Sequence, residues 1–317
     1  MKCVFLDKAT FADSIDFQPL QQYADTFEVF SLTPFDKIVE RCLNAEVIIT
    51  NKVVLDESIL RQLPALKLIC IAATGVNNVD LAAAKNLGIA VANVSGYSSH
   101  SVAQYVFSQL LHHVAKPHHH INNVSQGQWQ RSPSFCVHGE GSVELANKTM
   151  AIIGYGNLGQ TVANIAKAFG MKVLIAEQQH ATSIRNERVS FDYAIQEADF
   201  ISIHCPLTDS TLNLFNKETF CKMKSSAVLI NTARGNIVNE KDLIDALNNG
   251  EIAYAALDVL AQEPPPADYP TLLNQPANLA ITAHIAWASI ESQQRLINLV
   301  ADNIKAFSEG RRLNRVD

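Results

Sequence analysis

The stretch Ala151-Ile-Ile-Gly-Tyr-Gly-Asn-Leu-Gly159 decides the fold of this 317-residue chain. An apolar run typical of a buried strand breaks into three glycines, and an amphipathic pattern typical of a helix follows. Gly154 permits a tight turn, Gly156 lets the backbone approach a pyrophosphate, and Gly159 lets the helix pack on its strand. The N–H groups at the start of that helix favour a bound phosphate. The spacing therefore predicts a dinucleotide-binding site.

A second stretch, Val173-Leu-Ile-Ala-Glu177, supplies the acid that such a site needs. Glu177 lies 23 residues after Gly154 (177 − 154), where a carboxylate can accept the hydroxyl groups of a ribose. Glu177 is followed by Gln178 and Gln179 and not by an arginine, which could pair with a phosphate on the ribose. A 2′-phosphate would meet an anion without a compensating cation, so we expect NAD rather than NADP as the cofactor.

The composition indicates a globular protein without a nucleic-acid partner. Hydrophobic residues make up 48% of the chain and charged residues 18%, and a net charge of −6 argues against binding a polyanion. No apolar run approaches the roughly 20 residues of a membrane helix, and Met1–Asp7 reaches a carboxylate too early for a secretory signal. The six cysteines are scattered, which indicates reduced thiols in a cytoplasmic protein and predicts no metal site.

Apolar runs alternate with helical patterns along the chain, which predicts an α/β fold of parallel sheets covered by helices on both faces. Four runs are assigned to a first unit: Cys3–Leu6, Val47–Thr50, Leu68–Ala72 and Ile89–Ala92. Six runs are assigned to a dinucleotide-binding sheet: Met150–Ile153, Val173–Ala176, Phe200–His204, Val228–Thr232, Ala253–Asp258 and Leu279–Thr282. An apolar stripe on the helix predicted over Ser289–Phe307 is expected to return to the first unit. We expect a discontinuous domain of residues 1–98 plus 290–317, a dinucleotide-binding domain of residues 99–289, and a cleft between them.

The segment Ile121–Asn147 has few strand or helix signals, and irregular segments of this length usually have a function. It holds an aromatic pair, Trp129 and Phe135, and the helix predicted before it, Ser99–Ala115, is apolar on more than one face. Both features favour a two-fold homodimer whose arms embrace the partner. Phe135 is then either a hydrophobic clasp or a residue that reaches the partner's cleft. The histidines His118–His120 are interpreted as the exposed end of that helix, not as metal ligands.

Three side chains follow consecutive strands of the second sheet, namely Arg234, Glu263 and His284. The carboxyl ends of parallel strands meet at one edge of a sheet, where ligands bind. Each residue alone has an ordinary structural interpretation, as a surface cation, a solvated acid or a loop histidine. Together, beside a bound cofactor, they indicate a catalytic site.

These motifs resemble the D-isomer-specific 2-hydroxyacid dehydrogenase family over essentially the whole chain. The resemblance rests on Gly154–Gly159, His204-Cys-Pro-Leu-Thr208, Asn231-Thr-Ala-Arg-Gly235, Asp258-Val-x-x-x-Glu-Pro264 and His284. Four stretches resemble the bacterial glycerate dehydrogenase (hydroxypyruvate reductase) branch of this family, namely Ile48–Val53, Ala72–Asp80, Glu263–Pro266 and His284–Ala288. The resemblance implies two doubly wound parallel-sheet domains, a Rossmann domain for NAD and a flavodoxin-like domain for the substrate. Ala283 departs from the family, in which many members have proline, and we expect a less restrained histidine backbone.

The resemblance also implies an activity, the reduction of hydroxypyruvate to D-glycerate or of glyoxylate to glycolate with NADH. His284 would donate a proton to the carbonyl oxygen, while Glu263 favours the protonated ring and fixes its orientation. Arg234 would grip the substrate carboxylate or 2-oxo group with its planar fork. The other implied substrate contacts are Lys52, Gly75 and Val76.

Contacts with the cofactor are implied in the same way. Asp258 would meet the nicotinamide amide, Val102 would line the ring, and His204–Thr208 would line the adenine side. The full implied set is Val102, Gly154, Gly156, Asn157, Leu158, Gly159, Glu177, His204, Cys205, Pro206, Thr208, Thr232, Ala233, Arg234, Asp258, His284 and Trp287.

Two other functions stay open from the sequence. One is another 2-oxo-acid reductase, such as a phosphoglycerate-type dehydrogenase, which is disfavoured because the chain ends soon after the returning helix without a regulatory domain. The other is a non-catalytic NAD(H)-sensing protein of the corepressor type. Such proteins tend to add a docking or disordered extension, and none is evident here.

Overall fold

The computed structural model describes residues 1–317, and the chain divides into two compact units. Unit 1 comprises Met1–Ser98 with Trp287–Asp317, and unit 2 comprises Ser99–Ala286. The second boundary lies three residues before the one expected at 289/290 (289 − 286). The indole ring of Trp287 packs edge-on against Phe11 and Tyr97, with centroids 5.8 and 6.2 Å apart. These aromatic contacts stabilise Trp287 within unit 1 rather than in the dinucleotide-binding domain.

Unit 1 is built on a parallel sheet with strand order β2-β1-β3-β4-β5, the order of flavodoxin-like doubly wound folds. The predicted fold class is confirmed for this unit. The strands are β1 (Lys2–Phe5), β2 (Thr26–Val29), β3 (Val47–Thr50), β4 (Leu68–Ile71) and β5 (Ala90–Ala92). The helices are α1 (Gln18–Gln21), α2 (Ile38–Cys42), α3 (Glu57–Leu60), α4 (Leu81–Asn86) and α12 (Ile290–Ser308), with short 3-10 turns η1 (Lys8–Thr10) and η2 (Phe35–Lys37).

The strand β2 is the element of unit 1 that the apolar pattern does not reveal. It lies at the edge of the sheet and pairs with β1 alone, with Thr26 opposite Lys2 and Val29 opposite Phe5. The side chains at both ends of the strand, Thr26 and Val29, are exposed. A half-covered edge strand needs no continuous apolar run, so its sequence carries only a weak signal.

Alternating side chains of the unit 1 sheet enter two separate hydrophobic layers. Cys3 and Phe5 belong to one layer, and Val4 belongs to the other. The helix α12 packs into the first layer through Leu296, Ile297, Val300 and Ile304, all at 0% exposure. The last helix of the sequence therefore completes the core of the first unit.

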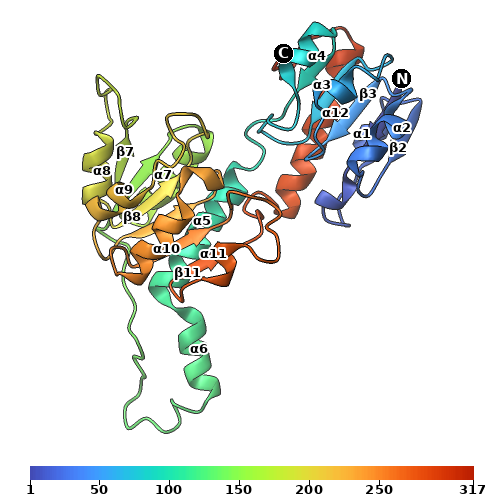
Figure 1. The fold of residues 1–317 in the computed structure, drawn as a ribbon. Coiled ribbons are helices and arrows are strands. Elements are labelled where there is room, and N and C mark those ends of the chain that lie inside the picture. Colours follow the sequence, from blue (N-terminus) through green and yellow to red (C-terminus); the bar gives the residue numbers. More distant parts are fainter. The chain divides into compact units, whose positions relative to one another are not determined.

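Unit 2 is built on a six-stranded parallel sheet with order β11-β10-β9-β8-β6-β7 and helices on both faces (Figure 1). Its strands are β6 (Thr149–Ile153), β7 (Lys172–Ala176), β8 (Phe200–Ile203), β9 (Val228–Asn231), β10 (Tyr254–Leu257) and β11 (Leu279–Ile281). Its helices are α5 (Ser99–Ala115), α6 (Pro117–Ser125), α7 (Asn157–Ala168), α8 (Phe191–Glu197), α9 (Lys217–Lys222), α10 (Glu240–Asn248) and α11 (Pro270–Leu273), with the 3-10 turn η3 (Gly235–Ile237). The dinucleotide-binding fold class is confirmed.

The strand order of unit 2 reverses at β6, which lies between β7 and β8. Val189 forms a single parallel bridge with Ala176 of β7, in the place that a third strand takes in the usual dinucleotide-binding order. Ligands of open parallel sheets bind where the strand order reverses, beyond the carboxyl ends of the strands. The glycine-rich turn that follows β6 stands at that point.

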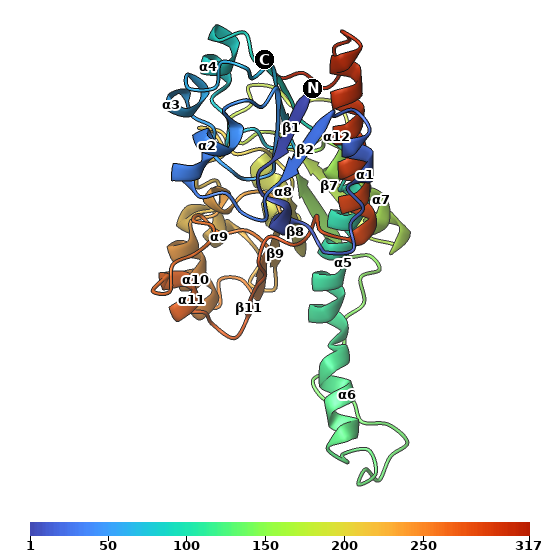
Figure 2. The ribbon, with the colours of Figure 1, turned by 90° about the vertical axis from the view of Figure 1, so that its right-hand side faces the viewer.

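The arm of unit 2 is partly helical, contrary to the expectation of an irregular segment. Lys116 adopts a left-handed backbone (φ 49°) that ends α5, and Pro117 opens the separate helix α6. The histidines His118–His120 therefore lie in the first turn of α6 and do not end the preceding helix. The α6 helix and the loop that returns from it project away from the rest of unit 2 (Figure 2).

Most apolar side chains of α5 are buried within the chain itself, although that of Leu111 is half-buried, so the apolar character of this helix does not by itself require a partner. Val102, Val106, Phe107, Leu110 and Val114 are exposed by 5% or less. The ring of Phe107 stacks on Phe169 with centroids 5.3 Å apart.

No helix in the structure combines the length and the apolar character that a membrane span requires.

Candidate active site

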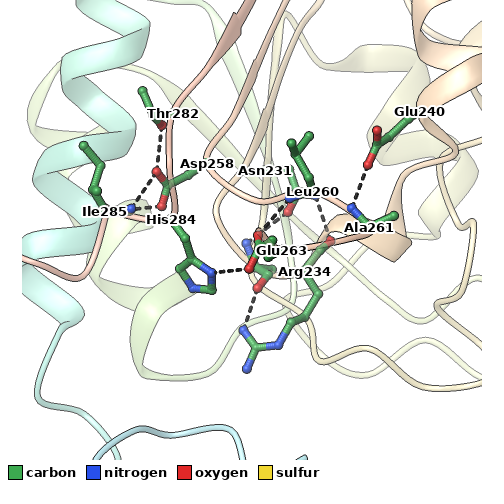
Figure 3. Close-up of polar contacts among 12 residues, drawn as sticks. Asn231, Arg234, Glu240, Asp258, Leu260, Ala261, Glu263, Thr282, His284 and Ile285 are labelled. Atoms are coloured by element: carbon green, nitrogen blue, oxygen red, sulfur yellow. Dashed lines mark hydrogen bonds and ion pairs between the residues drawn. The ribbon is translucent and has the colours of Figure 1, made fainter. Parts of the chain in front are cut away.

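The loop after β11 holds His284 in an unusual backbone conformation, with φ at 54°. The left-handed region costs roughly 1 kcal/mol or more for a residue with a Cβ, so surrounding bonds have to hold it. Asp258 supplies these bonds: its carbonyl oxygen accepts from the N–H of His284 at 2.8 Å, and its carboxylate accepts from the N–H groups of Ile285 and Ala286 at 3.0 and 2.8 Å (Figure 3). The histidine backbone is therefore restrained, contrary to the expectation drawn from Ala283.

Asp258 is itself tied to helix α5 through a chain of hydroxyl groups. The Thr282 hydroxyl donates to the Asp258 carboxylate at 2.7 Å and pairs with the Tyr105 phenol, which Gln109 also contacts at 2.9 Å. Burial raises the pKa of Tyr105, which keeps the phenol protonated and able to donate. The Ser101 hydroxyl also donates to the carbonyl oxygen of Ala286 at 2.7 Å. The first helix of unit 2 thus braces the loop that carries the histidine.

The imidazole ring is oriented by Glu263. Its Nδ1 lies 2.7 Å from Oε2 of Glu263, and the other carboxylate oxygen accepts from the N–H of Leu260 at 2.9 Å (Figure 3). A carboxylate can only accept, so Nδ1 carries the hydrogen in this pair. The other ring nitrogen, Nε2, is then the one available for proton exchange with a substrate.

A second acid, Glu240 at the start of α10, fixes the loop that precedes Glu263. Its carboxylate accepts from the N–H of Ala261 at 2.7 Å, from the Tyr269 hydroxyl at 3.0 Å and from the Thr271 hydroxyl. Sequence reasoning missed Glu240, because nothing in a helix-start acid indicates contact with a loop 21 residues later (261 − 240).

Arg234 follows β9 in a turn that Asn231 closes. The Asn231 side chain accepts from the N–H of Ala233 at 3.0 Å and donates to the carbonyl of Arg234 at 2.9 Å. The guanidinium Nη1 donates to the carbonyl of Ala233 at 2.7 Å (Figure 3). Next to it, Gly235 touches the loop after β10: a Cβ at Gly235 would lie 1.9 Å from the carbonyl carbon of Leu260. The turns that carry Arg234 and Glu263 are therefore in direct contact.

The glycine turn after β6 fits a dinucleotide. Gly154 has φ at 96°, and a Cβ there would lie 2.5 Å from the backbone nitrogen of Cys205. Nothing lies within 4 Å of a Cβ built at Gly156, the N-cap of α7, so space is open at the start of that helix. The Thr232 hydroxyl, at the end of β9, is buried without a hydrogen-bond partner in the protein. An open helix start and an unpaired buried hydroxyl are what a bound phosphate-containing ligand would satisfy.

A pocket of about 540 Å³ extends from this glycine turn. The predicted cofactor residues that line it are Gly154, Gly156, Glu177, Cys205, Pro206 and Thr208. His204 is held by the Ser202 hydroxyl, 2.8 Å from its Nε2, and burial lowers its pKa to about 4, so the ring is neutral at pH 7. Burial also raises the pKa of Cys205 to about 11, which leaves its thiol protonated.

Glu177 is paired with arginines, which corrects the expectation that no cation stands beside it. Arg185 donates through Nε and Nη2 to the two carboxylate oxygens at 2.7 and 2.5 Å, and Nη1 of Arg188 lies 3.7 Å away. The hydrogen bonds from Arg185 lower the pKa of Glu177 to about 2. Both arginines come from the irregular segment between β7 and α8, 8 and 11 residues after Glu177 (185 − 177 and 188 − 177), beyond the positions that the motif specifies.

The predicted substrate residues of unit 1 lie in two loops at the carboxyl ends of its strands. Lys52 follows β3, and its backbone N–H donates to Asp7 at 2.6 Å. Burial raises the pKa of Asp7, an effect opposed by hydrogen bonds from the backbone N–H groups of residues 51–53. Gly75 and Val76 follow β4 and are half-buried. The structure shows that Asp7, missed as a site residue from sequence, shapes the loop of Lys52.

Comparison with known proteins identifies the family. Residues 107–286, more than half of the chain, match the family model for the NAD binding domain of D-isomer specific 2-hydroxyacid dehydrogenases. The chain belongs to the D-isomer specific 2-hydroxyacid dehydrogenase family. As a member, it is an NAD-dependent oxidoreductase, so the predicted cofactor is confirmed.

Similar proteins cover the dehydrogenase over its full length. The hydroxypyruvate reductase of Blautia hydrogenotrophica is 36% identical over 326 aligned positions, which span 100% of both chains. The glycerate dehydrogenase of Methylorubrum extorquens is 39% identical over 326 positions, which span 100% of this chain and 99% of its own. The crystal structure of a D-lactate dehydrogenase with NAD+ from Lactobacillus jensenii matches with a TM-score of 0.77 at 28% identity and covers 100% of this chain and 99% of its own.

Family membership does not itself assign each residue of the dehydrogenase. Asp258 is 2% exposed and already bonds the loop of His284, so its contact with the nicotinamide amide stays a prediction. Val102 is buried on α5, and its contact with the ring also stays a prediction. Trp287 is expected to touch the cofactor, yet its ring packs on Phe11 and Tyr97.

Proposed function

We propose that this dehydrogenase reduces hydroxypyruvate and glyoxylate with NADH, forming D-glycerate and glycolate. The observation that carries the proposal is the 2.7 Å contact between His284 and Glu263, on the loops that follow β11 and β10. A histidine oriented by a carboxylate is suited to donate a proton to a carbonyl oxygen. The substrate assignment is supported by the names of the two relatives described above, which denote the same conversion in opposite directions.

Each residue of the site has its own role in the proposed reaction. NADH, held at the glycine turn of Gly154 and Gly156, would supply the hydride for the 2-carbon of the oxo acid. Nε2 of His284 gives its proton to the carbonyl oxygen, and Glu263 stabilises the charged ring before transfer. Arg234 pairs its fork with the substrate carboxylate or 2-oxo group and thereby orients the carbonyl. Lys52 and the backbone of Gly75 and Val76 bind the carboxylate from unit 1.

The proposed activity is tested by NADH oxidation with hydroxypyruvate, glyoxylate, pyruvate and phosphohydroxypyruvate, followed by absorbance. Hydroxypyruvate and glyoxylate are expected to give the highest kcat/KM, and D-glycerate but not L-glycerate should reduce NAD in the reverse direction. A preference for phosphohydroxypyruvate or pyruvate would replace the substrate assignment. Absence of turnover with every oxo acid would overturn the enzymatic role in favour of NAD(H) sensing.

We also propose that two copies of the dehydrogenase associate through the arm of residues 121–147 in the cytoplasm. Six free cysteines agree with a reducing compartment. The arm exposes large apolar side chains that its own chain leaves uncovered: Phe135 is 89% exposed, Ile121 64% and Trp129 53%. The indole N–H of Trp129 donates to the carbonyl of Phe135 at 2.9 Å, so the pair is presented together. Exposed apolar patches of this kind commonly mark an interface between proteins.

A dimer predicts a sedimentation mass of 69.6 kDa, twice the 34.8 kDa of one chain (2 × 34.8). Phe135→Ala should raise the dimer dissociation constant by about tenfold or more, because burial of an aromatic ring is a large term at an interface. Leu273→Ala is the matched control, since Leu273 is 68% exposed but lies outside the arm. A wild-type monomer at micromolar concentration would contradict the dimer. If Phe135→Ala changes the substrate range instead, Phe135 reaches the partner's site.

A further inference from the structure

The pocket beside the glycine turn carries more positive charge than its sequence motif specifies. Its wall contains Glu177 but also Arg185 and Arg188. The side chain of Glu177 is 3% exposed and that of Arg188 18%, whereas the Arg185 side chain is 59% exposed. Two guanidinium groups against one carboxylate leave a net positive charge at the end of β7, where the ribose of the adenosine is expected.

The carboxylate of Glu177 has no acceptor position left for a ribose. Oε1 accepts from the N–H of Gln178 at 3.0 Å and from Nη2 of Arg185 at 2.5 Å. Oε2 accepts from Nε of Arg185 at 2.7 Å and from its backbone N–H at 3.4 Å. A carboxylate offers about four acceptor sites, so these four bonds saturate it. The ribose hydroxyls of NADH can bind Glu177 only after the Arg185 side chain withdraws.

The withdrawn arginine needs another anion, and the chemistry of the ligand decides whether one is present. NADH leaves the fork of Arg185 in solvent. A 2′-phosphate offers it a doubly charged, bidentate partner beside Arg188, which is the arrangement that guanidinium groups favour for phosphate. The neighbours Gln178 and Gln179, which also line the pocket, are neutral and add no repulsion.

We propose that Arg185 sets the choice of dinucleotide, and that the pocket accepts the 2′-phosphate of NADPH beside the NADH that the family motif specifies. Arg185 exchanges the carboxylate of Glu177 for the 2′-phosphate, with Arg188 as its second cation. The proposal rests on NAD binding by unit 2, but it does not depend on which oxo acid is reduced.

The test compares adenosine 2′,5′-bisphosphate with adenosine 5′-monophosphate, which differ by the 2′-phosphate alone. Binding is measured by calorimetry without an oxo acid, at a fixed and moderate salt concentration. The wild-type protein is expected to bind the bisphosphate at least as tightly as the monophosphate. Arg185→Ala should weaken the bisphosphate by about tenfold to a hundredfold, the usual value of a charge-assisted fork, without weakening the monophosphate. The ratio of kcat/KM for NADPH over NADH should fall in parallel.

Arg61→Ala is the matched control. Arg61 pairs with Glu57 through the same two nitrogens, is 63% exposed and lies in unit 1, so neither dissociation constant should change. Arg185→Lys keeps the charge without the fork and should lose less bisphosphate affinity than Arg185→Ala. The proposal is overturned if Arg185→Ala leaves the ratio of the two dissociation constants within twofold of wild type, or if neither nucleotide binds. Absence of a preferred oxo acid would leave this binding result intact and would overturn the proposed substrate alone.

Discussion

His284→Ala is expected to lower kcat for hydroxypyruvate reduction by about 10²–10⁴-fold, the usual contribution of a positioned acid–base group. The ring is held for this role by its 2.7 Å contact with Glu263 and by the bonds from Asp258 to the backbone around it. NADH affinity should change little, because His284 is not among the residues that line the adenosine pocket. Stopped-flow or steady-state kinetics with a fluorescence titration of NADH separates the two effects.

Two further variants serve as a comparison and a control for this result. Glu263→Gln keeps a hydrogen-bonding side chain but removes the charge that stabilises the imidazolium, so it should lose less turnover than His284→Ala. His112→Ala removes an exposed histidine of α5 and should retain wild-type kinetics. Turnover of His284→Ala within tenfold of wild type would refute the assignment of this residue as proton donor.

Gly235→Ala is expected to destabilise unit 2 and its active site together. The added Cβ would lie 1.9 Å from the carbonyl carbon and 2.1 Å from the carbonyl oxygen of Leu260, so backbone has to move. Overpacking of this kind costs about 3 kcal/mol, which lowers Tm by roughly 6–12 °C in a domain of this size. Because the displaced loops carry Arg234 and Glu263, kcat/KM should fall by more than tenfold even at temperatures where the protein is folded.

Gly250→Ala is the control, because it changes the strain of a left-handed backbone without creating a clash between loops. Gly250 has φ at 69°, and nothing lies within 4 Å of a Cβ built there. This variant should lose about 1 kcal/mol of stability from the left-handed backbone and keep its activity. Equal losses of activity in the two variants, or an unchanged Tm for Gly235→Ala, would contradict the proposed contact between the loops.

The parts of the site that could be predicted from sequence are those that local patterns encode. The glycine spacing and Glu177 belong to one continuous strand–helix–strand stretch. A short piece of sequence is therefore sufficient to recognise them. Arg234 and His284 could be placed because parallel strands deliver the residues after them to one edge. These inferences need the order of the strands along the chain but no knowledge of side-chain packing.

The missed features depend on where irregular segments fold back. Arg185 reaches Glu177 through a loop without a motif, and Tyr105 reaches Thr282 across 177 residues of sequence. Asp7 binds the loop after β3 because β1 and β3 are neighbours in the sheet, a pairing that the apolar runs do not specify. Apolar periodicity likewise does not indicate whether the apolar side chains of α5 pack within their own chain or against a partner.

The brace between α5 and the loop of His284 has a mechanical consequence. The chain passes between the units after Ser98 and after Ala286, and the Ser101 hydroxyl bonds the carbonyl of Ala286. The two ends of unit 2 therefore lie side by side. His284 lies close to the second of these ends, and Asp258 holds the backbone at His284 and Ile285 to the sheet of unit 2. The position of the proton donor is therefore set within unit 2 and does not depend on the chain that continues beyond Ala286.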